Sequence, residues 1–300
     1  MCASCSIKFS VTVITPSYNS SRFLQDNIQS VKNQTHPLIE HIIVDGGSTD
    51  GTLNILKKHD RIMWISERDK GFAHACNKGL HMAKGAIINI QNADDYFYSE
   101  ESIEQVVEVF RNNPSVAMVF GDCNHVDTEG SIVWNGLGYG SQYSLKNLLC
   151  SKVTLPQGST FFKRNVAFNV GLLNQELWVN EEVHFFMKIA LKHPVVYLPK
   201  VLSCYRLHEG QLTKRLTPTF RKRVVDKLLT FNPQLNMIQN QLYEGASDFE
   251  LYKLWQHTKL FNLSKRFTTL KFFRFLKNRF PYTKLAVNKG LRTLYRWIYW

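Results

Sequence analysis

The sequence predicts an α/β fold, with a mainly parallel central sheet flanked by helices. The first observation is that short β-branched apolar runs alternate with amphipathic segments through the first 120 residues. The second is that polar residues follow each apolar run, at the end of each expected strand. The third is size, because 300 residues with 44% hydrophobic content suffice for a full core.

The elements follow in order along the chain. The first strand is expected at residues 11–15, and Leu24, Ile28 and Val31 then recur at helical spacing. Ser99 precedes two glutamates and an apolar stripe. This pattern predicts a helix that begins there with Ser99 as its N-terminal cap. The other expected strands are 41–44, 62–65, 86–90 and 116–120, and the other expected helices are 52–58 and 73–83.

Two neighbouring carboxylates, Asp94 and Asp95, follow shortly after the apolar run 86–90. Two like charges about 4 Å apart repel by roughly 4 kcal/mol at the effective dielectric of a protein surface, so something must offset the repulsion. One explanation is a solvated polar turn, which Asp suits. The other is a divalent cation held by the carboxylates and itself holding phosphate. Ligands of parallel sheets bind at the carboxyl ends of the strands, where this pair is expected.

The first strand is followed by Pro16-Ser17-Tyr18-Asn19. A dinucleotide-binding enzyme has Gly-x-Gly-x-x-Gly at this position, so that backbone amides can approach a pyrophosphate. Without that cradle, the diphosphate of a bound nucleotide needs another positive partner, which a metal at Asp94 and Asp95 could supply.

The motifs together resemble the family 2 glycosyltransferases of GT-A (nucleotide-diphospho-sugar transferase) fold. The stretches that carry the resemblance are Val13 to Asn19, Val44-Asp45-Gly46-Gly47-Ser48-Thr49-Asp50-Gly51-Thr52, Asp69-Lys70-Gly71, Asn77-Lys78-Gly79 and Asn92-Ala93-Asp94-Asp95. The likeness extends to about residue 215. It implies a catalytic domain over 1–215, with a nucleotide-sugar half at about 8–122 and an acceptor half at about 123–215. The implied reaction transfers a sugar from a nucleoside diphosphate donor to a hydroxyl, with inversion.

The resemblance also implies roles for the donor side. Thr15, Pro16 and Tyr18 would line the nucleoside pocket, Asp45 would hydrogen-bond the base, and Asp69 would lie close to it. A uridine nucleotide is expected as donor because the family often uses one.

The metal side is implied in the same way. Asp94 and Asp95 would contact the ribose and a Mg²⁺ or Mn²⁺ ion that bridges the diphosphate, and which of the two is the direct ligand stays open. Tyr205-Arg206-Leu207-His208 resembles the closing motif of the family, where His208 would approach the metal or the diphosphate.

Inversion requires a base on the face of the sugar opposite the diphosphate. Glu182 is expected in that role, since Phe185, Phe186 and Ile189 follow it at helical spacing and place its carboxylate on the buried face of a helix, with Glu181 pointing elsewhere. The family usually has Asp at the position of Glu182, so the base here is longer by one methylene. The alternative role for Glu182 is a helix N-terminal acid that the dipole stabilises.

Two further stretches bear on the resemblance. Pro156 to Phe162 resembles the acceptor-side strand of the family. His74 departs from the family, which often has an acid there, and this predicts altered contacts with the donor sugar.

The charge is concentrated in the last third of the chain. Residues 211–300 contain 18 Lys and Arg against 4 Asp and Glu, whereas residues 1–210 contain 19 against 20. We expect a basic helical extension over 216–300 that meets an anionic membrane surface, because Val287, Leu291 and Ile298 share a helix side opposite Arg292. A helix packed back on the catalytic domain is the alternative, and nucleic acid is disfavoured because no nucleic-acid motif accompanies the charge.

The N-terminus lacks the pattern of a secretory signal, and no window reaches the roughly 18 apolar residues of a membrane-spanning helix. A cytoplasmic protein with reduced thiols is therefore expected, peripheral at the inner face of the plasma membrane. Cys2-x-x-Cys5 has no second pair at zinc-site spacing.

The predicted function is a metal-dependent inverting glycosyltransferase acting on a glycan or lipid-linked acceptor. Two other interpretations stay open. One is a non-catalytic protein that binds nucleotide-sugar as an assembly partner. The other is a nucleotidyltransferase, which uses a similar sheet but normally has a Gly-rich first loop.

Overall fold

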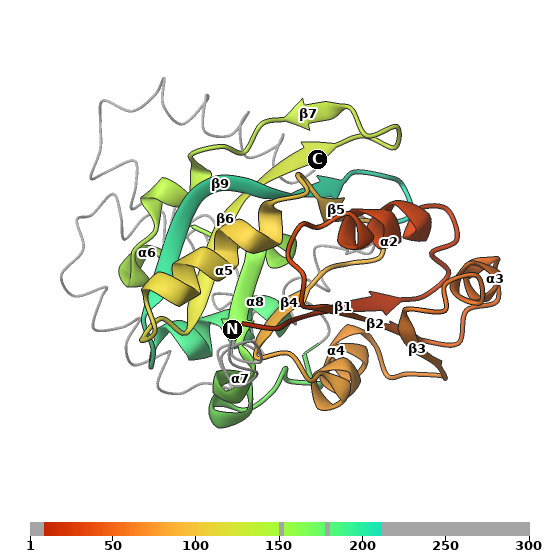
Figure 1. Ribbon diagram of the computed structural model, residues 1–300, viewed down its shortest axis with the longest axis horizontal. Helices are drawn as coiled ribbons and strands as arrows, with labels where there is room; N and C mark the ends of the chain where they lie inside the picture. The colour runs from red at the N-terminus through yellow and green to blue at the C-terminus, as the bar shows by residue number, and fades with distance from the viewer. Residues whose placement is uncertain (1–8, 150–152, 178–180, 212–300) are drawn as a thin grey trace, which may run out of the picture. The chain divides into compact units, whose positions relative to one another are not determined.

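The computed structural model describes residues 9–149, 153–177 and 181–211. The predicted basic extension 216–300, the predicted boundary at residue 215 and the Cys2–Cys5 pair lie outside these residues. Within them, nine strands form one mixed sheet in the order β3-β2-β1-β4-β8-β6-β9-β5, with β7 paired to β6 (Figure 1). The strands are β1 (Val11–Ser17), β2 (Ile39–Asp45), β3 (Met63–Ser66), β4 (Ile87–Ile90), β5 (Tyr96–Phe97), β6 (Met118–Val126), β7 (Ile132–Trp134), β8 (Thr160–Lys163) and β9 (Val195–Arg206).

Six of these nine strands point the same way. β1 to β4 pair in parallel, and β8 lies antiparallel between β4 and β6, so β6 and its parallel neighbour β9 follow the direction of β4. The short strands β5 and β7 run antiparallel to β9 and β6. The predicted mainly parallel central sheet is therefore confirmed, and β8 is the antiparallel insertion that joins its two halves.

Helices cover both faces of the sheet, as predicted. The α-helices are α2 (Leu24–Lys32), α3 (Thr52–Leu56), α4 (Phe72–Met82), α5 (Ser102–Asn112), α6 (Leu145–Leu149), α7 (Arg164–Val170) and α8 (Glu181–Ala190), and short 3₁₀ turns lie at η1 (Tyr139–Gln142) and η2 (Gln157–Ser159). On one face, α2 and α5 pack over Val11, Val13 and Phe161 in a single core cluster. On the other face, Gly79 of α4 lies so close to Ile14 that a Cβ would collide with its side chain.

The helix α8 shares the face of α4. Phe162 follows Phe161 on β8 and points to the opposite side of the sheet. Its ring packs on Phe185 of α8 at a centroid distance of 5.0 Å and on Phe186 at 6.3 Å. The start of α8, with its two glutamates, is thereby fixed on the α4 side.

The predicted elements up to residue 120 are all present, with ends that differ by a few residues. One local prediction is wrong: Ser99 does not cap α5. The helix begins at Ser102 after Glu101, and the Ser99 N–H instead donates to the Ser102 hydroxyl at 3.1 Å. The hydroxyl of Ser102 thus satisfies a backbone donor of the preceding turn, and this shifts the start of the helix.

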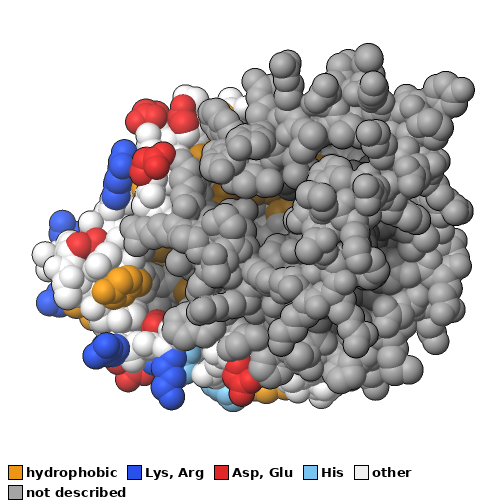
Figure 2. Space-filling model, turned by 180° about the vertical axis from the view of Figure 1, so that it is seen from behind, with side chains coloured by type: hydrophobic (Ala, Val, Ile, Leu, Met, Phe, Trp, Pro, Cys, Tyr) orange, Lys and Arg blue, Asp and Glu red, His pale blue; other side chains and the backbone are white. Residues whose placement is uncertain are grey.

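Three further features of the described residues concern the thiols, the helix lengths and the surface charge. Cys76, Cys123 and Cys204 are buried free thiols. In the part of the chain that the structure describes, every helix is too short or too polar to cross a membrane. Acidic and basic side chains are interspersed over the described surface visible in Figure 2, in keeping with the near-neutral balance of residues 1–210.

Candidate active site

The ends of β1, β2 and β4 bring the predicted acidic residues to one edge of the sheet. After β4, residues 92–95 form a tight turn in which the Asp95 N–H donates to the Asn92 carbonyl at 3.1 Å. We call residues 92–95 the acidic turn. The Asn92 amide also donates to the Asp95 carboxylate at 3.1 Å, so the turn is closed by its own side chains.

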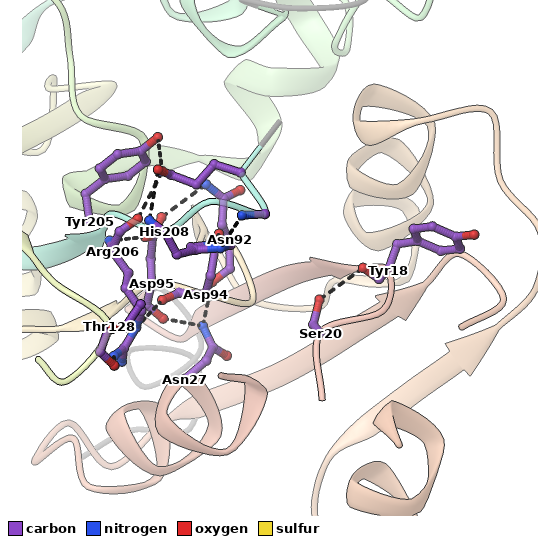
Figure 3. A network of polar contacts seen from close by, with 12 residues as sticks. Tyr18, Ser20, Asn27, Asn92, Asp94, Asp95, Thr128, Tyr205, Arg206 and His208 are labelled. Carbon is purple, nitrogen blue, oxygen red and sulfur yellow. Dashed lines mark hydrogen bonds and ion pairs between the residues drawn. The ribbon is translucent and has the colours of Figure 1, made fainter. Parts of the chain in front are cut away.

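Three other elements hold the acidic turn from outside (Figure 3). Asn27 of α2 is fully buried and its amide donates to the carbonyls of Asn92 at 2.9 Å and Asp95 at 3.0 Å. Gln157 of η2 donates to the Asn92 side-chain oxygen at 2.9 Å. The end of β9 supplies Arg206. A turn fixed from three sides can present a carboxylate without reorganising when a ligand arrives.

The two aspartates of the turn have different surroundings. Asp95 is 4% exposed, and its carboxylate accepts from the Arg206 N–H at 2.9 Å and from Asn92. Burial and the neighbouring Asp94 raise the pKa of the Asp95 carboxyl well above its usual range, against the opposing effect of those hydrogen bonds. Asp95 therefore faces the protein, and Asp94 is the aspartate of the turn that reaches the rim.

Asp94 lies at the rim and faces His208. Its carboxylate is 2.9 Å from the His208 Nε2, with side-chain exposures of 31% for Asp94 and 14% for His208. The Gly210 N–H donates to His208 Nδ1 at 3.2 Å, so the proton of the neutral ring is on Nε2 and is donated to Asp94. To ligate a metal through Nε2, the ring must move its proton to Nδ1 and lose the Gly210 contact.

The residues present fit a divalent cation that is shared with a phosphate ligand. Among the described residues, no group of three or more His, Cys, Asp or Glu side chains is arranged to hold a metal alone. Mg²⁺ in nucleotide sites is commonly bound by one or two carboxylates together with substrate phosphates. Asp94 meets that pattern with the one carboxylate at the rim, and His208 lies beside it.

Arg206 is the residue that the sequence interpretation missed. Its side chain is 3% exposed, and its guanidinium donates to the Asp94 carbonyl at 3.1 Å, the Thr128 carbonyl at 2.8 Å and the Asp26 carboxylate at 2.7 Å. The rings of Phe23 and Tyr96 lie 4.7 and 5.2 Å from the guanidinium carbon. The available signal was an arginine at the end of an apolar strand, two residues before His208.

Asp45 organises the loop after β2. It is fully buried, and its Oδ2 accepts from the N–H groups of Gly47 at 3.1 Å and Ser48 at 2.8 Å and from the Ser66 hydroxyl at 2.7 Å. Its Oδ1 accepts from the Ser48 hydroxyl. Three donors therefore converge on Oδ2 and one reaches Oδ1. Each carboxylate oxygen has two lone pairs, so Oδ1 keeps one that the expected hydrogen bond to the base would use.

Asp69 lies beside this loop. Its carboxylate packs against Gly46, where a Cβ would come within 2.8 Å of Oδ2. Its Oδ1 accepts from the Gly71 N–H at 2.8 Å, which fixes the turn into α4. His74 in the first turn of α4 is partly buried, and its Nδ1 accepts from the Lys70 N–H at 3.3 Å.

The three residues expected to line the nucleoside pocket, Thr15, Pro16 and Tyr18, differ in solvent exposure. Thr15 is fully buried, with its hydroxyl 3.3 Å from Asn27 Oδ1 and 3.0 Å from His41 Nε2, so its side chain does not face a pocket. Pro16 is partly exposed, and Tyr18 is 64% exposed. In Figure 3 the Tyr18 ring lies away from the acidic turn and points outward. An exposed ring at that position can stack on a base while Asp94 meets the phosphates.

The glutamates at the start of α8 differ from the prediction. Glu181 is 4% exposed and Glu182 is partly exposed, so Glu181 does not point away from the protein. The helix is buried nearly all round, and an apolar stripe therefore did not distinguish the two. Burial raises the pKa of Glu181 to about 7, with a contribution from Glu182, and burial also raises the pKa of Glu182.

The buried Cys76 thiol connects these glutamates to the donor side. Burial raises its pKa, and the carboxylates of Glu181, Glu182 and Asp69 raise it further. The start of α8 therefore lies near Cys76, in the middle of α4.

Comparison with known proteins agrees with this geometry. The family model described as glycosyl transferase family 2 matches residues 12–173. A chondroitin synthase of Escherichia coli is 33% identical over 133 residues, which are 43% of this chain and 19% of that protein. The chain spans less than half the length of the first curated relatives that it matches.

Two solved structures are similar to the fold. One is residues 1–349 of S. aureus TarS in complex with UDP-GlcNAc, at a TM-score of 0.66 and 18% identity, covering 87% of this chain and 77% of that one. The other is a mannosyltransferase from Pyrobaculum calidifontis in complex with GDP-Man and Mn²⁺, at a TM-score of 0.59 and 18% identity, covering 94% of this chain and 84% of that one.

Proposed function

Because this chain belongs to glycosyl transferase family 2, we propose that it transfers a sugar, with inversion, from a nucleoside diphosphate donor to a hydroxyl of a glycan or glycolipid acceptor. The observation that carries the proposal is the Asp94–His208 pair, held at the sheet edge by the fixed acidic turn. The proposal names a uridine nucleotide as donor, which the similarity to a structure holding UDP-GlcNAc supports.

Asp94 and His208 would hold Mg²⁺ or Mn²⁺ together with the donor diphosphate. A cation bound there supplies positive charge that stabilises the diphosphate as it leaves. The Mn²⁺ in the structure of the similar mannosyltransferase supports a divalent ion in this fold. Arg206 and Asn27 keep the Asp94 carbonyl and the turn backbone in place, so the carboxylate is oriented before the donor binds.

The nucleoside would lie along the end of β1. Tyr18 offers an exposed ring for stacking on the base, and the loop that Asp45 organises, with Asp69 beside it, would form the opposite wall. Asp45 orders this loop through Oδ2, and its Oδ1 would accept a hydrogen bond from the base, with Asp69 close to it.

Glu182 is the proposed general base. In the reaction, its carboxylate takes the proton of the acceptor hydroxyl while the oxygen forms a bond to the anomeric carbon. The bond from that carbon to the diphosphate oxygen breaks, and its electron pair leaves with the diphosphate. A raised pKa brings a carboxyl nearer to the operating pH, which makes it a better proton acceptor.

We also propose that the protein binds an anionic membrane surface, because the last third of the chain is strongly basic. The 18 basic residues of that third suit an anionic lipid surface that carries a lipid-linked acceptor. Binding to vesicles with and without anionic lipid at low salt tests this part, and equal binding to neutral and anionic vesicles would refute it.

A thermal-shift screen of nucleoside diphosphate sugars tests the function. A donor that binds the folded chain raises the melting temperature by mass action, and we expect the shift to require Mn²⁺ or Mg²⁺. Release of nucleoside diphosphate from the same donor then identifies transfer. Release of pyrophosphate from a sugar phosphate and a nucleoside triphosphate would instead identify a nucleotidyltransferase, and binding without turnover would identify a non-catalytic partner.

A further inference from the structure

The strand β7 leaves all of its side chains exposed at the rim of the sheet (Figure 1). Ile132, Val133 and Trp134 are 50%, 55% and 43% exposed, and Leu137 just after them is 61% exposed. Contiguous exposed apolar side chains on a soluble protein commonly mark an interaction site. None of these residues has a part in the chemistry described above.

Trp134 begins a row of aromatic rings that runs inward across the sheet, and the ring of Tyr139 also lies 6.0 Å from it in an edge contact. The Trp134 ring centroid lies 4.7 Å from that of His125 on β6, and the His125 ring lies 5.4 Å from Tyr205 on β9. The strand register explains the row, because His125 pairs with Trp134 on one side and with Tyr205 on the other. We call Trp134, His125 and Tyr205 the aromatic row.

The inner end of the aromatic row adjoins the acidic turn. Gln211 is 5% exposed, and its amide donates to the Tyr205 hydroxyl at 2.8 Å while its oxygen accepts from the His208 N–H at 3.1 Å. His208 in turn contacts Asp94. Figure 3 shows Tyr205 beside His208 at one side of the network. One side chain therefore connects the row to the residues that would hold the diphosphate.

The aromatic row also shares a sheet face with the acceptor-side segment. Ser203 lies two residues before Tyr205 on β9 and so points to the same face, where its hydroxyl is 2.6 Å from that of Ser159 in η2. Arg206 points to the opposite face, toward Asp26 of α2. The row thus runs along the η2 face, from the reacting edge outward to the rim.

We propose that the aromatic row binds the acceptor glycan, with a pyranose ring stacked on Trp134. This inference rests on the proposed function, since it names the acceptor site of the same reaction. A pyranose has a C–H face and a rim of hydroxyl groups, and aromatic rings with polar edges offer surfaces complementary to both. A stable protein interface takes about 20 to 30 residues a side, far more than the exposed apolar side chains of this hairpin.

The test compares Trp134→Ala with Trp134→Phe, which keeps a ring, and with Val133→Ala. Val133 is also exposed, at 55% against 43% for Trp134, but points to the other face of β7, so it is a matched control. Chitotetraose and cellotetraose serve as probes, with binding followed by saturation-transfer NMR of the sugar ring protons. We expect Trp134→Phe and Val133→Ala to bind the tetrasaccharides like the wild type. Trp134→Ala should bind them about tenfold more weakly, which is the effect of one lost ring contact.

UDP binding is measured on the same proteins by calorimetry with Mn²⁺. It distinguishes failure of the proposed function from failure of the proposed acceptor site. If the wild type does not bind UDP, the proposed function fails. If UDP binds equally to all variants but Trp134→Ala retains the affinity of the wild type for the tetrasaccharides, or if the wild type binds neither of them, the aromatic row is not the acceptor site. A change of oligomeric mass in Trp134→Ala with unchanged sugar binding would assign the rim to a protein contact and would also overturn the proposal.

Discussion

The carboxylate of Asp94 accepts a hydrogen bond from the imidazole of His208 at 2.9 Å, although 114 positions separate them in the chain. This contact joins the turn after β4 to the loop after β9. It places one carboxylate and one imidazole side by side at the edge where parallel sheets bind their ligands. Hydrogen bonds from Arg206, Asn27 and Gln157 hold the turn that carries Asp94.

The two aspartates of the acidic turn should respond differently to the same change. We expect Asp94→Asn to weaken Mn²⁺-dependent nucleotide binding at least about tenfold and to leave stability nearly unchanged, because Asp94 is at the rim. Asp95→Asn should lower the free energy of unfolding by about 1–3 kcal/mol, because an amide cannot accept from both the Arg206 N–H and Asn92. Urea unfolding and calorimetry measure the two effects, and the reverse pattern would contradict the assignment.

Replacing Arg206 by Lys should destabilise the fold by about 2–4 kcal/mol, because Lys cannot serve the carbonyls of Asp94 and Thr128 together with Asp26. Asp26→Asn is the matched control. The Asp26 side chain is 57% exposed, so losing that ion pair should cost less than about 1 kcal/mol. Denaturant titration of both variants tests the order, and equal losses would show that the ion pair, not the carbonyl contacts, matters.

Tyr18→Ala should weaken nucleotide binding by about tenfold or more, since stacking of a base on an aromatic ring contributes about 1–3 kcal/mol. Tyr18→Phe keeps the ring and should bind like the wild type. Neither variant should change the melting temperature, because Tyr18 is 64% exposed. A loss of binding in Tyr18→Phe equal to that in Tyr18→Ala would show that the hydroxyl, and not the ring, makes the contact.

Glu182→Gln should reduce sugar transfer by about 10²- to 10⁴-fold, the usual contribution of a general base, while donor binding persists. Glu181→Gln is the control at the neighbouring position and should retain transfer. For the wild type, the transfer rate should fall as the pH falls through the raised pKa of Glu182, because only the ionised form can accept the proton. Transfer that survives in Glu182→Gln would remove this residue from the mechanism.

Glu181 should make the stability of the protein depend on pH. Burial raises its pKa to about 7, so the folded state holds a proton that the unfolded state releases above its ordinary value of 4.5. Its stabilising contribution is complete below about pH 4.5 and is lost as the pH rises through 7, which amounts to about 3 kcal/mol. Urea unfolding of wild type and Glu181→Gln at pH 5 and pH 8 checks this. We expect the variant to lose less stability than the wild type, and parallel losses would contradict it.

The fold could be predicted because its strands are short apolar runs buried on both faces. β1 and β4 are almost entirely buried, and such runs separated by amphipathic helices leave few alternatives to a parallel sheet. The edge of the sheet that carries Asp45, Asp69 and Asp94 followed from the direction of those strands alone.

The roles within the site could not be predicted in the same way, because they depend on contacts between distant segments. That Asp95 is turned inward depends on Arg206, 111 positions away. That three donors meet on Asp45 Oδ2 depends on Ser66 in β3 as well as on the loop of Asp45 itself. The two glutamates of α8 could not be told apart, because neighbours on several sides bury this helix and no single stripe marks its inner face.

The most direct test of the account is the manganese anomalous signal of a crystal soaked with UDP and Mn²⁺, recorded for the wild type and for Asp94→Asn. We predict one peak in the wild type within bonding distance of an Asp94 oxygen and of the UDP diphosphate, and its loss in the variant. A peak that persists in Asp94→Asn, or UDP bound with its diphosphate away from Asp94 and His208, would contradict the central claim.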